Sequence, residues 1–336
     1  MSSVGSQRLG WGIVGPGRIA GAQIAPAIGA CENAALAGVV SRDLGRAGEF
    51  ARAHGAAAAL DDYAKLLADP AVDVVYIATP NALHAEQVTA AARAGKHVLC
   101  DKPLALTPAE ARQCVGACRE AGVRLGIMFQ TRYHDGLAEA ARLVRDGEIG
   151  KVVTAEVTMS GGRNLPKGWR TDPGLAGLGT LNNIGVHALD VLRYLLGSEV
   201  TEVTALSSSE PGFSIETTAL VLLRFASGTL GYVHVNQSAP HARDDIVLYG
   251  SLGRVLAANL SRPERDGTLT VTTEAGERSY PGSTRDAYRR VIDAFGAAVA
   301  AGRDPSPSGE DGLRSVELTT AIAEALRERR AVALPG

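Results

Sequence analysis

Short apolar runs alternate with longer amphipathic segments over about the first 130 residues of the chain. The runs are continuous rather than alternating, which is typical of parallel strands covered on both faces. They predict strands at residues 9–14, 35–40, 72–78, 97–100 and 123–129. Helices are expected between them, at 18–29, 44–54, 83–94 and 108–121. This alternation predicts an α/β domain with a doubly wound parallel sheet.

Beyond residue 150, apolar and polar positions alternate along the expected strands, most clearly at 151–158 and 229–235. Such alternation indicates a sheet with one packed and one exposed face. Further strands are expected at 216–225, 244–249 and 268–273, and helices at 186–196, 285–301 and 309–330. We therefore predict one domain over residues 1–129 and an α+β domain over 130–336, built on a mixed, largely antiparallel open sheet.

Composition narrows the classes of function. Hydrophobic residues make up 46% of the 336 positions, and the net charge of −2 gives no sign of a surface for nucleic acid or an anionic membrane. No apolar run approaches a membrane span, and the first residues lack the regions of a signal peptide, so we expect a cytoplasmic protein. The spacing of the cysteines matches no common zinc pattern and predicts four reduced thiols, at Cys31, Cys100, Cys114 and Cys118.

The turn after the first strand has the pattern of a dinucleotide-binding loop. Between strand and helix stand Gly15, Pro16, Gly17, Arg18 and Ile19. The first glycine permits a tight turn, and the second lets the backbone approach a pyrophosphate at the amide-rich helix start. We predict that these five residues bind a nicotinamide dinucleotide; a purely structural turn is the alternative.

The end of the second strand bears on which nicotinamide cofactor binds. Ser41 and Arg42 follow this strand, and a hydroxyl beside a guanidinium suits the 2′-phosphate of NADP. Asp43 offers the alternative of an acid for the ribose hydroxyl of NAD, unless it only caps the next helix. We predict NADP, with NAD as the alternative.

Polar residues also follow the third and fourth strands. Thr79 and Asn81 carry groups able to bond a ribose or the nicotinamide, and His84 falls in the next helical turn. We assign all three to the cofactor site; for His84, a solvated histidine beside an Asn81 cap is the alternative. Lys102 lies at the end of the fourth strand, and ligands of open parallel sheets bind at that end, so Lys102 is a candidate catalytic residue.

A second cluster opens the expected helix at 186–196. Asn183 and His187 are four residues apart and project from the same side if a helix starts here. A neutral imidazole suits a base for an alcohol proton, and a histidine satisfied within the fold is the alternative. Asp190 either orients this ring or solvates the helix. Trp169 and Arg170 lie in a basic loop that either holds a ligand or is simply solvated.

No metal site is expected. His234 and His241 lie close together in the sequence, but their neighbours supply no convincing set of further ligands.

Six segments in this order resemble the Gfo/Idh/MocA oxidoreductase family over almost the whole chain, at residues 15–20, 78–84, 101–103, 130–134, 169–170 and 183–187. The resemblance implies an N-terminal Rossmann domain, and a C-terminal sheet domain that receives a sugar, polyol or sugar derivative and often forms the oligomer interface. It implies that Lys102 and His187 are the catalytic pair, and that a cis bond precedes Pro103. It further assigns Asp101, Gln130, Trp169 and Arg170 to the cofactor, and Arg132 and Asn183 to the substrate.

Two positions depart from the family's pattern. Asp101 replaces the usual glutamate, and Asn183 stands where many members carry an aspartate. Asn183 can form hydrogen bonds but cannot titrate, so Lys102 is the charged group we place beside the base.

We hypothesise an NADP-preferring dehydrogenase or reductase that forms a homodimer or homotetramer through its C-terminal sheet. In it, His187 accepts the hydroxyl proton and Lys102 stabilises the charge on the same oxygen. The alternatives are an NAD-dependent glycosidase that works by transient oxidation and elimination, and a non-catalytic regulator that binds a dinucleotide or a sugar.

Overall fold

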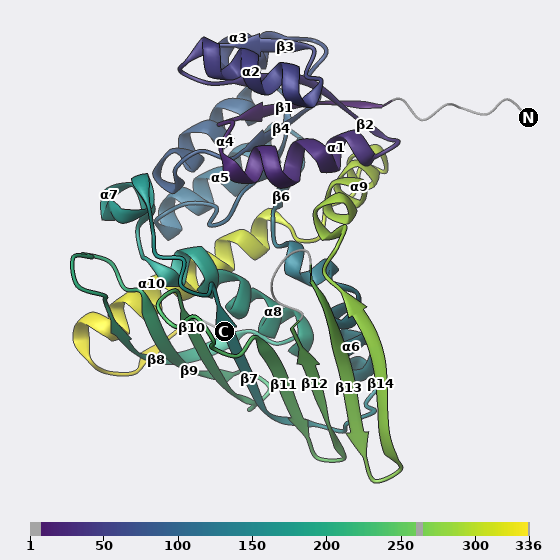
Figure 1. Cartoon of the computed structure of the whole chain (residues 1–336), viewed down its shortest axis with the longest axis vertical. Coiled ribbons are helices and arrows are strands. Elements are labelled where there is room, and N and C mark those ends of the chain that lie inside the picture. Colours follow the sequence, from purple (N-terminus) through teal and green to yellow (C-terminus); the bar gives the residue numbers. More distant parts are fainter. Residues whose placement is uncertain (1–7, 260–264, 335–336) are drawn as a thin grey trace, which may run out of the picture. The chain divides into compact units, whose positions relative to one another are not determined.

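The computed structural model describes residues 8–259 and 265–334 (Figure 1). Its internal contacts divide these residues into two compact units. The first is the chain up to Met128 together with Tyr288–Leu313, and the second is Phe129–Ala287 together with the chain from Arg314 onward.

The first unit contains a six-stranded sheet in the order β3-β2-β1-β4-β5-β6. Every neighbouring pair is parallel, as the α/β prediction requires. The strands are β1 (Leu9–Val14), β2 (Ala34–Val40), β3 (Ala58–Leu60), β4 (Val74–Ile77), β5 (His97–Cys100) and β6 (Leu125–Ile127). Because the strand order reverses between β1 and β4, the carboxyl ends of these two strands form the switch point where such sheets bind ligands.

Helices connect these strands. They are α1 (Ala25–Ala30), which continues the π-helical turn η1 (Ala20–Ile24), and then α2 (Leu44–His54), α3 (Tyr63–Ala68), α4 (His84–Arg93) and α5 (Pro108–Glu120). Sequence signals set several ends: the Asp43 carboxylate caps α2, and Thr107 with Glu110 forms a capping box at the start of α5. The expected helices at 18–29, 44–54, 83–94 and 108–121 are all present with small shifts. β3 and α3 were not predicted, because both are short.

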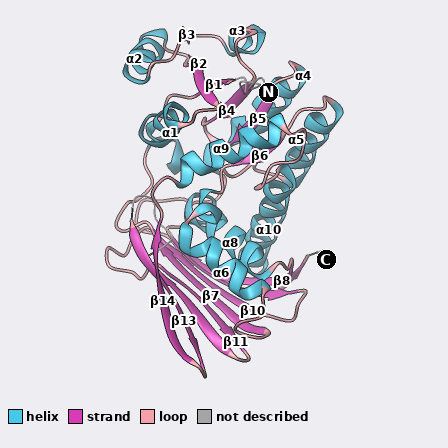
Figure 2. Cartoon of the chain, turned by 90° about the vertical axis from the view of Figure 1, so that its right-hand side faces the viewer, coloured by secondary structure: helices cyan, strands magenta, loops and turns pink. Residues whose placement is uncertain are grey.

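Helix α9 (Ala287–Ala300) adds a distant segment to the first unit, from Tyr288 onward. Its Phe295 ring lies edge-on to Trp11 in β1, with the centroids 5.7 Å apart. A Cβ atom on Gly126 in β6 would come within 2.8 Å of the same ring, so only glycine fits there. The sequence-based division placed all residues after 129 in the second domain. The contact of Phe295 with Trp11 ties α9 to the first sheet. Figure 2 shows the helix beside that sheet.

The second unit contains a nine-stranded sheet in the order β14-β13-β12-β11-β7-β10-β9-β8-β15. Its strands are β7 (Val152–Ser160), β8 (Val200–Ser208), β9 (Thr218–Phe225), β10 (Leu230–Asn236), β11 (Asp245–Gly250), β12 (Gly253–Ala258), β13 (Asp266–Thr273), β14 (Gly276–Ser283) and β15 (Val332–Ala333). Strands β7 and β10 pair in parallel and the other described neighbours pair antiparallel, which confirms a mixed, largely antiparallel sheet.

Helices cover one face of this sheet. These are α6 (Asp135–Arg145), α8 (Val186–Leu196) and α10 (Gly309–Glu328), which lie on the same side in Figure 2. The short helix α7 (Pro173–Ala176) lies in the loop after β7. The other face of the sheet exposes apolar side chains, among them Leu206 and Leu222, which expose 72% and 55% of their surface. Within the described chain, no helix has both the length and the apolar character needed to cross a membrane.

Candidate active site

The first unit brings its predicted site residues to one edge of the sheet. The Ala78 amide donates to the Val14 carbonyl and the Asp101 amide to the Ile77 carbonyl, both at 2.9 Å. The carboxyl ends of β1, β4 and β5 are therefore in register. The glycine turn, the residues after β4 and Lys102 consequently lie along the same edge.

The glycine turn has the geometry that a pyrophosphate needs. Gly15 has a φ of +87°, and a Cβ atom there would lie 2.9 Å from the Ala78 carbonyl oxygen. At Gly17 a Cβ atom would meet nothing closer than the Gly15 oxygen at 4.0 Å, so this side of the turn is open. The helix begins directly afterwards at Arg18. These residues fit a dinucleotide whose phosphates approach the backbone at a helix start.

The end of β2 presents arginines rather than a free acid. Asp43 Oδ1 accepts from the Arg46 amide at 3.1 Å and so caps α2, which was one of the expected alternatives. Arg42 is exposed, and no described side chain forms an ion pair with it. Arg46, which the sequence analysis missed, donates from Nη2 to the Pro16 carbonyl at 3.0 Å and so places a guanidinium at the glycine turn.

The residues after β4 are held from several sides. Thr79 Oγ1 donates to Gln87 Oε1 at 2.6 Å, and Asn81, in the 3₁₀ turn η2 (Asn81–Leu83), is buried. His84 is completely buried, so the alternative of a solvated histidine is wrong. Its ring nitrogens lie at two backbone carbonyls, Nδ1 2.7 Å from the Pro103 oxygen and Nε2 3.0 Å from the Thr79 oxygen. Burial lowers the pKa of this imidazole, although these contacts and the charge of Asp101 oppose the shift.

Lys102 follows β5 in a turn that its neighbours define. The Lys102–Pro103 peptide is cis, as the family resemblance implied. The Lys102 amide donates to Asp101 Oδ1 at 2.8 Å, so the acid before the lysine fixes its backbone. The lysine itself is half-buried.

In the second unit, Asn183 and His187 occupy one continuous helical run. It starts with the π-helical turn η5 (Leu181–Gly185) and continues as α8. Both residues are half-buried. The His187 ring lies edge-on to Phe129, with centroids 6.1 Å apart and an interplanar angle of 80°.

Glu216 supports the start of this run and was missed from the sequence. Its Oε2 accepts from the Gly179 amide at 2.8 Å and its Oε1 from the Leu181 amide at 2.9 Å, while its carbonyl accepts from the Thr180 amide. Burial raises the pKa of this carboxyl, and the two amide bonds oppose that shift. A carboxylate at a helix start satisfies donors that otherwise lack partners and complements the helix dipole. The signal in the sequence was an acid at the buried end of a predicted strand.

Arg132 has a partner that the sequence did not suggest. Its Nε and Nη2 donate to the two carboxylate oxygens of Asp190 at 2.8 and 2.6 Å, and both residues are buried. The guanidinium also lies 5.3 Å from the centre of the Tyr194 ring. The idea that Asp190 solvates its helix is therefore wrong.

The remaining predicted residues also lie in the second unit. Trp169 and Arg170 belong to the 3₁₀ turn η4 (Gly168–Thr171), where the guanidinium stacks 4.3 Å from the centre of the indole. Both are half-buried rather than freely solvated. Gln130 is buried in the turn η3 (Gln130–Tyr133) next to Arg132.

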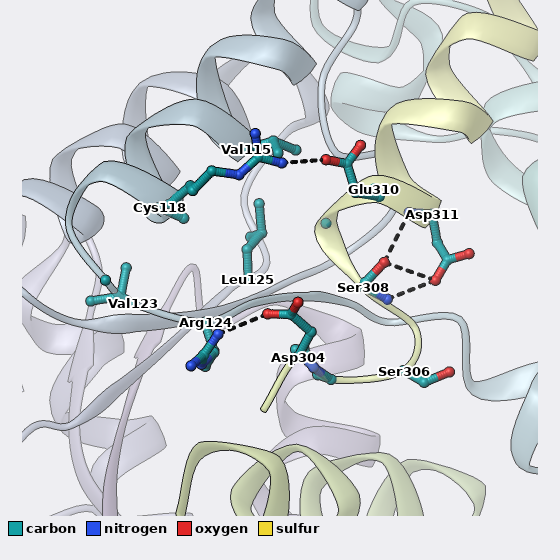
Figure 3. Close-up of a pocket in the computed structure, with 14 residues that line it drawn as sticks. Val115, Cys118, Val123, Arg124, Leu125, Asp304, Ser306, Ser308, Glu310 and Asp311 are labelled. Atoms are coloured by element: carbon teal, nitrogen blue, oxygen red, sulfur yellow. Dashed lines mark hydrogen bonds and ion pairs between the residues drawn. The ribbon is translucent and has the colours of Figure 1, made fainter. Parts of the chain in front are cut away.

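A cavity of about 540 Å³ in the first unit contains none of the predicted residues (Figure 3). It lies between the end of α5, the segment before α10 and the start of β6. The cavity is therefore at the amino end of β6, whereas Lys102 follows the carboxyl end of the neighbouring strand β5. Arg124 pairs with Asp304 and Arg119 with Glu310 across its wall, so its positive charges are compensated. Cys118, in its lining, is buried.

The described residues contain no group of three or more histidine, cysteine or acidic side chains that could hold a metal ion. All four cysteines are buried and form no disulfide bond. Burial raises the pKa values of the Cys31, Cys114 and Cys118 thiols to about 12, which keeps them protonated and unreactive.

Comparison with known proteins identifies the family. Residues 9–129 match the oxidoreductase family with an NAD-binding Rossmann fold, and residues 137–256 match the C-terminal domain of the same family. A 1,5-anhydro-D-fructose reductase from Ensifer adhaerens is 34% identical over 94% of this chain and 95% of its own length. A D-xylose 1-dehydrogenase (NADP(+)) from Haloferax volcanii is also 34% identical, over 96% of this chain and 99% of its own.

Solved structures agree with this assignment. Levoglucosan dehydrogenase in complex with NADH and levoglucosan superposes with a TM-score of 0.90 at 26% identity, covering 98% of this chain and 100% of that one. The fold, both matched domains and these relatives show a sugar or polyol oxidoreductase with an NAD-binding Rossmann fold. The chain belongs to the Gfo/Idh/MocA oxidoreductase family.

Proposed function

We propose that this oxidoreductase prefers NADP and transfers hydride between it and the carbon of a sugar or polyol hydroxyl or ketone, with Lys102 and His187 as its catalytic residues. The observation that supports this proposal most is that Lys102 and the open glycine turn lie at the same end of the parallel sheet, after the carboxyl ends of β5 and β1. A lysine at that edge lies where such sheets bind their ligands.

Each residue has a defined task in this proposal. The bound nicotinamide supplies or accepts the hydride. In oxidation, His187 accepts the hydroxyl proton, and in reduction it returns the proton to the ketone oxygen. Lys102 donates a hydrogen bond to the same oxygen and stabilises the negative charge that develops there. Asn183 orients the substrate through neutral hydrogen bonds. The Arg132 guanidinium is paired with the Asp190 carboxylate. Arg132 therefore contributes to substrate binding by fixing the turn around it.

The preference for NADP is supported by the end of β2. Arg46 supplies positive charge at the glycine turn, the exposed Arg42 follows β2, and the Asp43 carboxylate is engaged as a helix cap. A 2′-phosphate is recognised by guanidinium groups, whereas NAD sites use a free acid for the ribose hydroxyl. Among the relatives, one name specifies NADP and one structure contains NADH, so the family accommodates both cofactors.

The exposed face of the nine-stranded sheet supports a homodimer or homotetramer. On this face Leu206 lies opposite Leu220, and Leu222 lies opposite Tyr232. The three leucines are exposed and Tyr232 is half-buried. A contiguous row of accessible apolar side chains marks an interaction surface in a soluble protein. We propose that a second copy of this chain covers it, and that the protein acts in the cytoplasm.

A substrate panel tests the proposed function. Oxidation of D-xylose and levoglucosan and reduction of 1,5-anhydro-D-fructose are followed by nicotinamide absorbance, with NADP and NAD in parallel. Lys102→Met and His187→Ala are expected to lower turnover of the best substrate by roughly a hundredfold or more. Wild-type turnover in either variant contradicts the catalytic assignment. Tightly bound NAD with substrate cleavage but no net absorbance change would instead favour the glycosidase, and binding without turnover would favour the regulator.

A further inference from the structure

The buried ring of His84 connects two turns of the candidate site. Thr79 follows β4, and Lys102 with Pro103 follows the neighbouring strand β5. Both ring nitrogens lie within hydrogen-bond distance of carbonyl oxygens in these turns, at 2.7 Å for Pro103 and 3.0 Å for Thr79. A carbonyl oxygen can only accept, so the ring acts here as a donor. Because the ring is completely buried, it does so from inside the fold.

The contact with Pro103 bears directly on Lys102. The backbone before the lysine side chain is held by Asp101 Oδ1, which accepts from the Lys102 amide at 2.8 Å. The backbone after it is held by His84 at the Pro103 carbonyl. We propose that His84 is a positioning residue that acts through Lys102, by donating from Nδ1–H to the Pro103 carbonyl and so fixing the backbone from which the lysine side chain extends. This inference rests on the proposed function, in which Lys102 contacts the reacting oxygen.

The turns at Pro103 and Thr79 depend to different degrees on their contacts with the His84 ring. A neutral imidazole has one N–H, and burial favours the neutral ring, so only one of the two carbonyls accepts a hydrogen bond from it. The contact with Pro103 is the shorter of the two. The turn at Thr79 has a second tie, because Thr79 Oγ1 donates to Gln87 at 2.6 Å. Loss of the ring therefore releases the turn of Lys102 more than that of Thr79.

Two conservative variants separate the contacts. In His84→Asn the side-chain amide nitrogen lies close to the position of Nδ1, whereas in His84→Gln it lies close to that of Nε2. We expect His84→Leu to lower kcat by roughly tenfold to a hundredfold, as small displacements of catalytic groups do. His84→Asn should recover most of this loss, and His84→Gln should not. The comparison of Asn with Gln stands even if His84→Leu fails to fold.

A matched control separates positioning from stability. His97 lies at the other end of β5, where its Nδ1 accepts from the Arg124 amide at 2.9 Å. His97→Leu also removes one imidazole–backbone bond from this strand and should reduce stability without lowering kcat. An equal loss of kcat in His97→Leu would overturn the positioning role.

A double-mutant cycle tests whether His84 acts through Lys102. In a Lys102→Met background, His84→Leu should lower the single-turnover rate by less than about twofold, because the group it positions is already gone. Additive losses, or recovery by Gln rather than Asn, overturn the inference. If Lys102→Met alone keeps wild-type turnover, the proposed function fails and the inference fails with it. If Lys102→Met is impaired while His84→Asn and His84→Gln behave alike, only the inference fails.

Discussion

Arg132 and Asp190, 58 positions apart in the sequence, form a buried pair with two parallel hydrogen bonds of 2.8 and 2.6 Å. Asp190 belongs to α8, the helix that also contains His187, and Arg132 belongs to the turn η3. The pair therefore ties the helix of the proposed base to the segment that opens the second unit.

Breaking this pair should be costly. Arg132→Met leaves the Asp190 carboxylate buried without its principal partner, and removal of one member of a buried pair costs about 3–5 kcal/mol of unfolding free energy. Arg132→Met combined with Asp190→Leu should recover much of that loss. Urea unfolding measures both. Arg142→Met, which breaks exposed pairs with Glu139 and Asp146, is the control and should cost about 1 kcal/mol or less. A loss that small for Arg132→Met would contradict the prediction.

The carboxylate of Glu216 should matter for both stability and turnover. Glu216→Gln replaces one oxygen that accepts a backbone amide by an NH₂ group that faces this donor, at a cost of about 1–3 kcal/mol. Because the affected helix contains Asn183 and His187, kcat should also fall. Glu202→Gln changes a half-buried glutamate of β8 that pairs with the exposed Arg224, and it should leave stability and kcat unchanged. Equal behaviour of the two variants would rule out a special role for Glu216.

The histidines predict how stability depends on pH. Burial lowers the pKa of His84 in the folded state below its ordinary value of about 6.5. Between the folded pKa and 6.5 the unfolded chain binds more protons, so the free energy of unfolding falls as the pH falls through this range. His97 and His234 contribute with the same sign, again through burial.

His84→Asn should therefore lose less stability than the wild type between about pH 7.5 and about pH 5.5. Urea unfolding at both pH values gives the difference. The exposed His241, changed to asparagine, provides the control and should keep the wild-type difference. An unchanged pH dependence in His84→Asn would show that the ring does not titrate in this range.

The cofactor preference should depend on Arg42. Arg42→Ala removes a guanidinium from the proposed 2′-phosphate site, and loss of a charge-assisted contact of about 1.5–3 kcal/mol raises the KM for NADP about tenfold or more. The KM for NAD should change little. Arg52→Ala alters an exposed arginine at the other end of α2 and serves as the control. A strong wild-type preference for NAD would contradict the assignment before any variant is made.

The exposed sheet face should control assembly. Leu222→Glu places a charge in the middle of the row that we propose a second copy covers, and it should shift the protein toward the monomer in analytical ultracentrifugation. Leu252→Glu, in the turn between β11 and β12, leaves this row intact and should assemble as the wild type does. A wild type that sediments as a monomer would refute the proposed interface.

The sequence pattern predicted those elements whose buried faces produce a regular pattern of apolar residues. The strands of the first sheet are covered on both faces and read as continuous apolar runs, so five of the six could be predicted. Strand β14 could not, because its sequence is polar and contains Pro281, a residue that sheets accept at an edge. Strand β12 and helix α6 were also not predicted.

The predicted site residues are those whose chemistry follows from a local motif, such as Gly15, Gly17 and Lys102. Glu216 and the partner of Arg132 escaped because their roles depend on contacts with residues more than 30 positions away. Local patterns do not specify which acid meets which donor across that distance. For His84, the motif gave the position, but only the folded structure shows that both ring nitrogens lie at backbone carbonyls.

The return of α9 to the first sheet has a consequence for synthesis of the chain. A ribosome releases the amino end first, and domains fold as their residues emerge. The first sheet, complete in strands after Ile127, still lacks the Phe295 ring that packs on Trp11 and Gly126. About half of the chain, including the whole nine-stranded sheet apart from β15, is made before that ring arrives. The cofactor-binding fold is thus begun first and finished almost last.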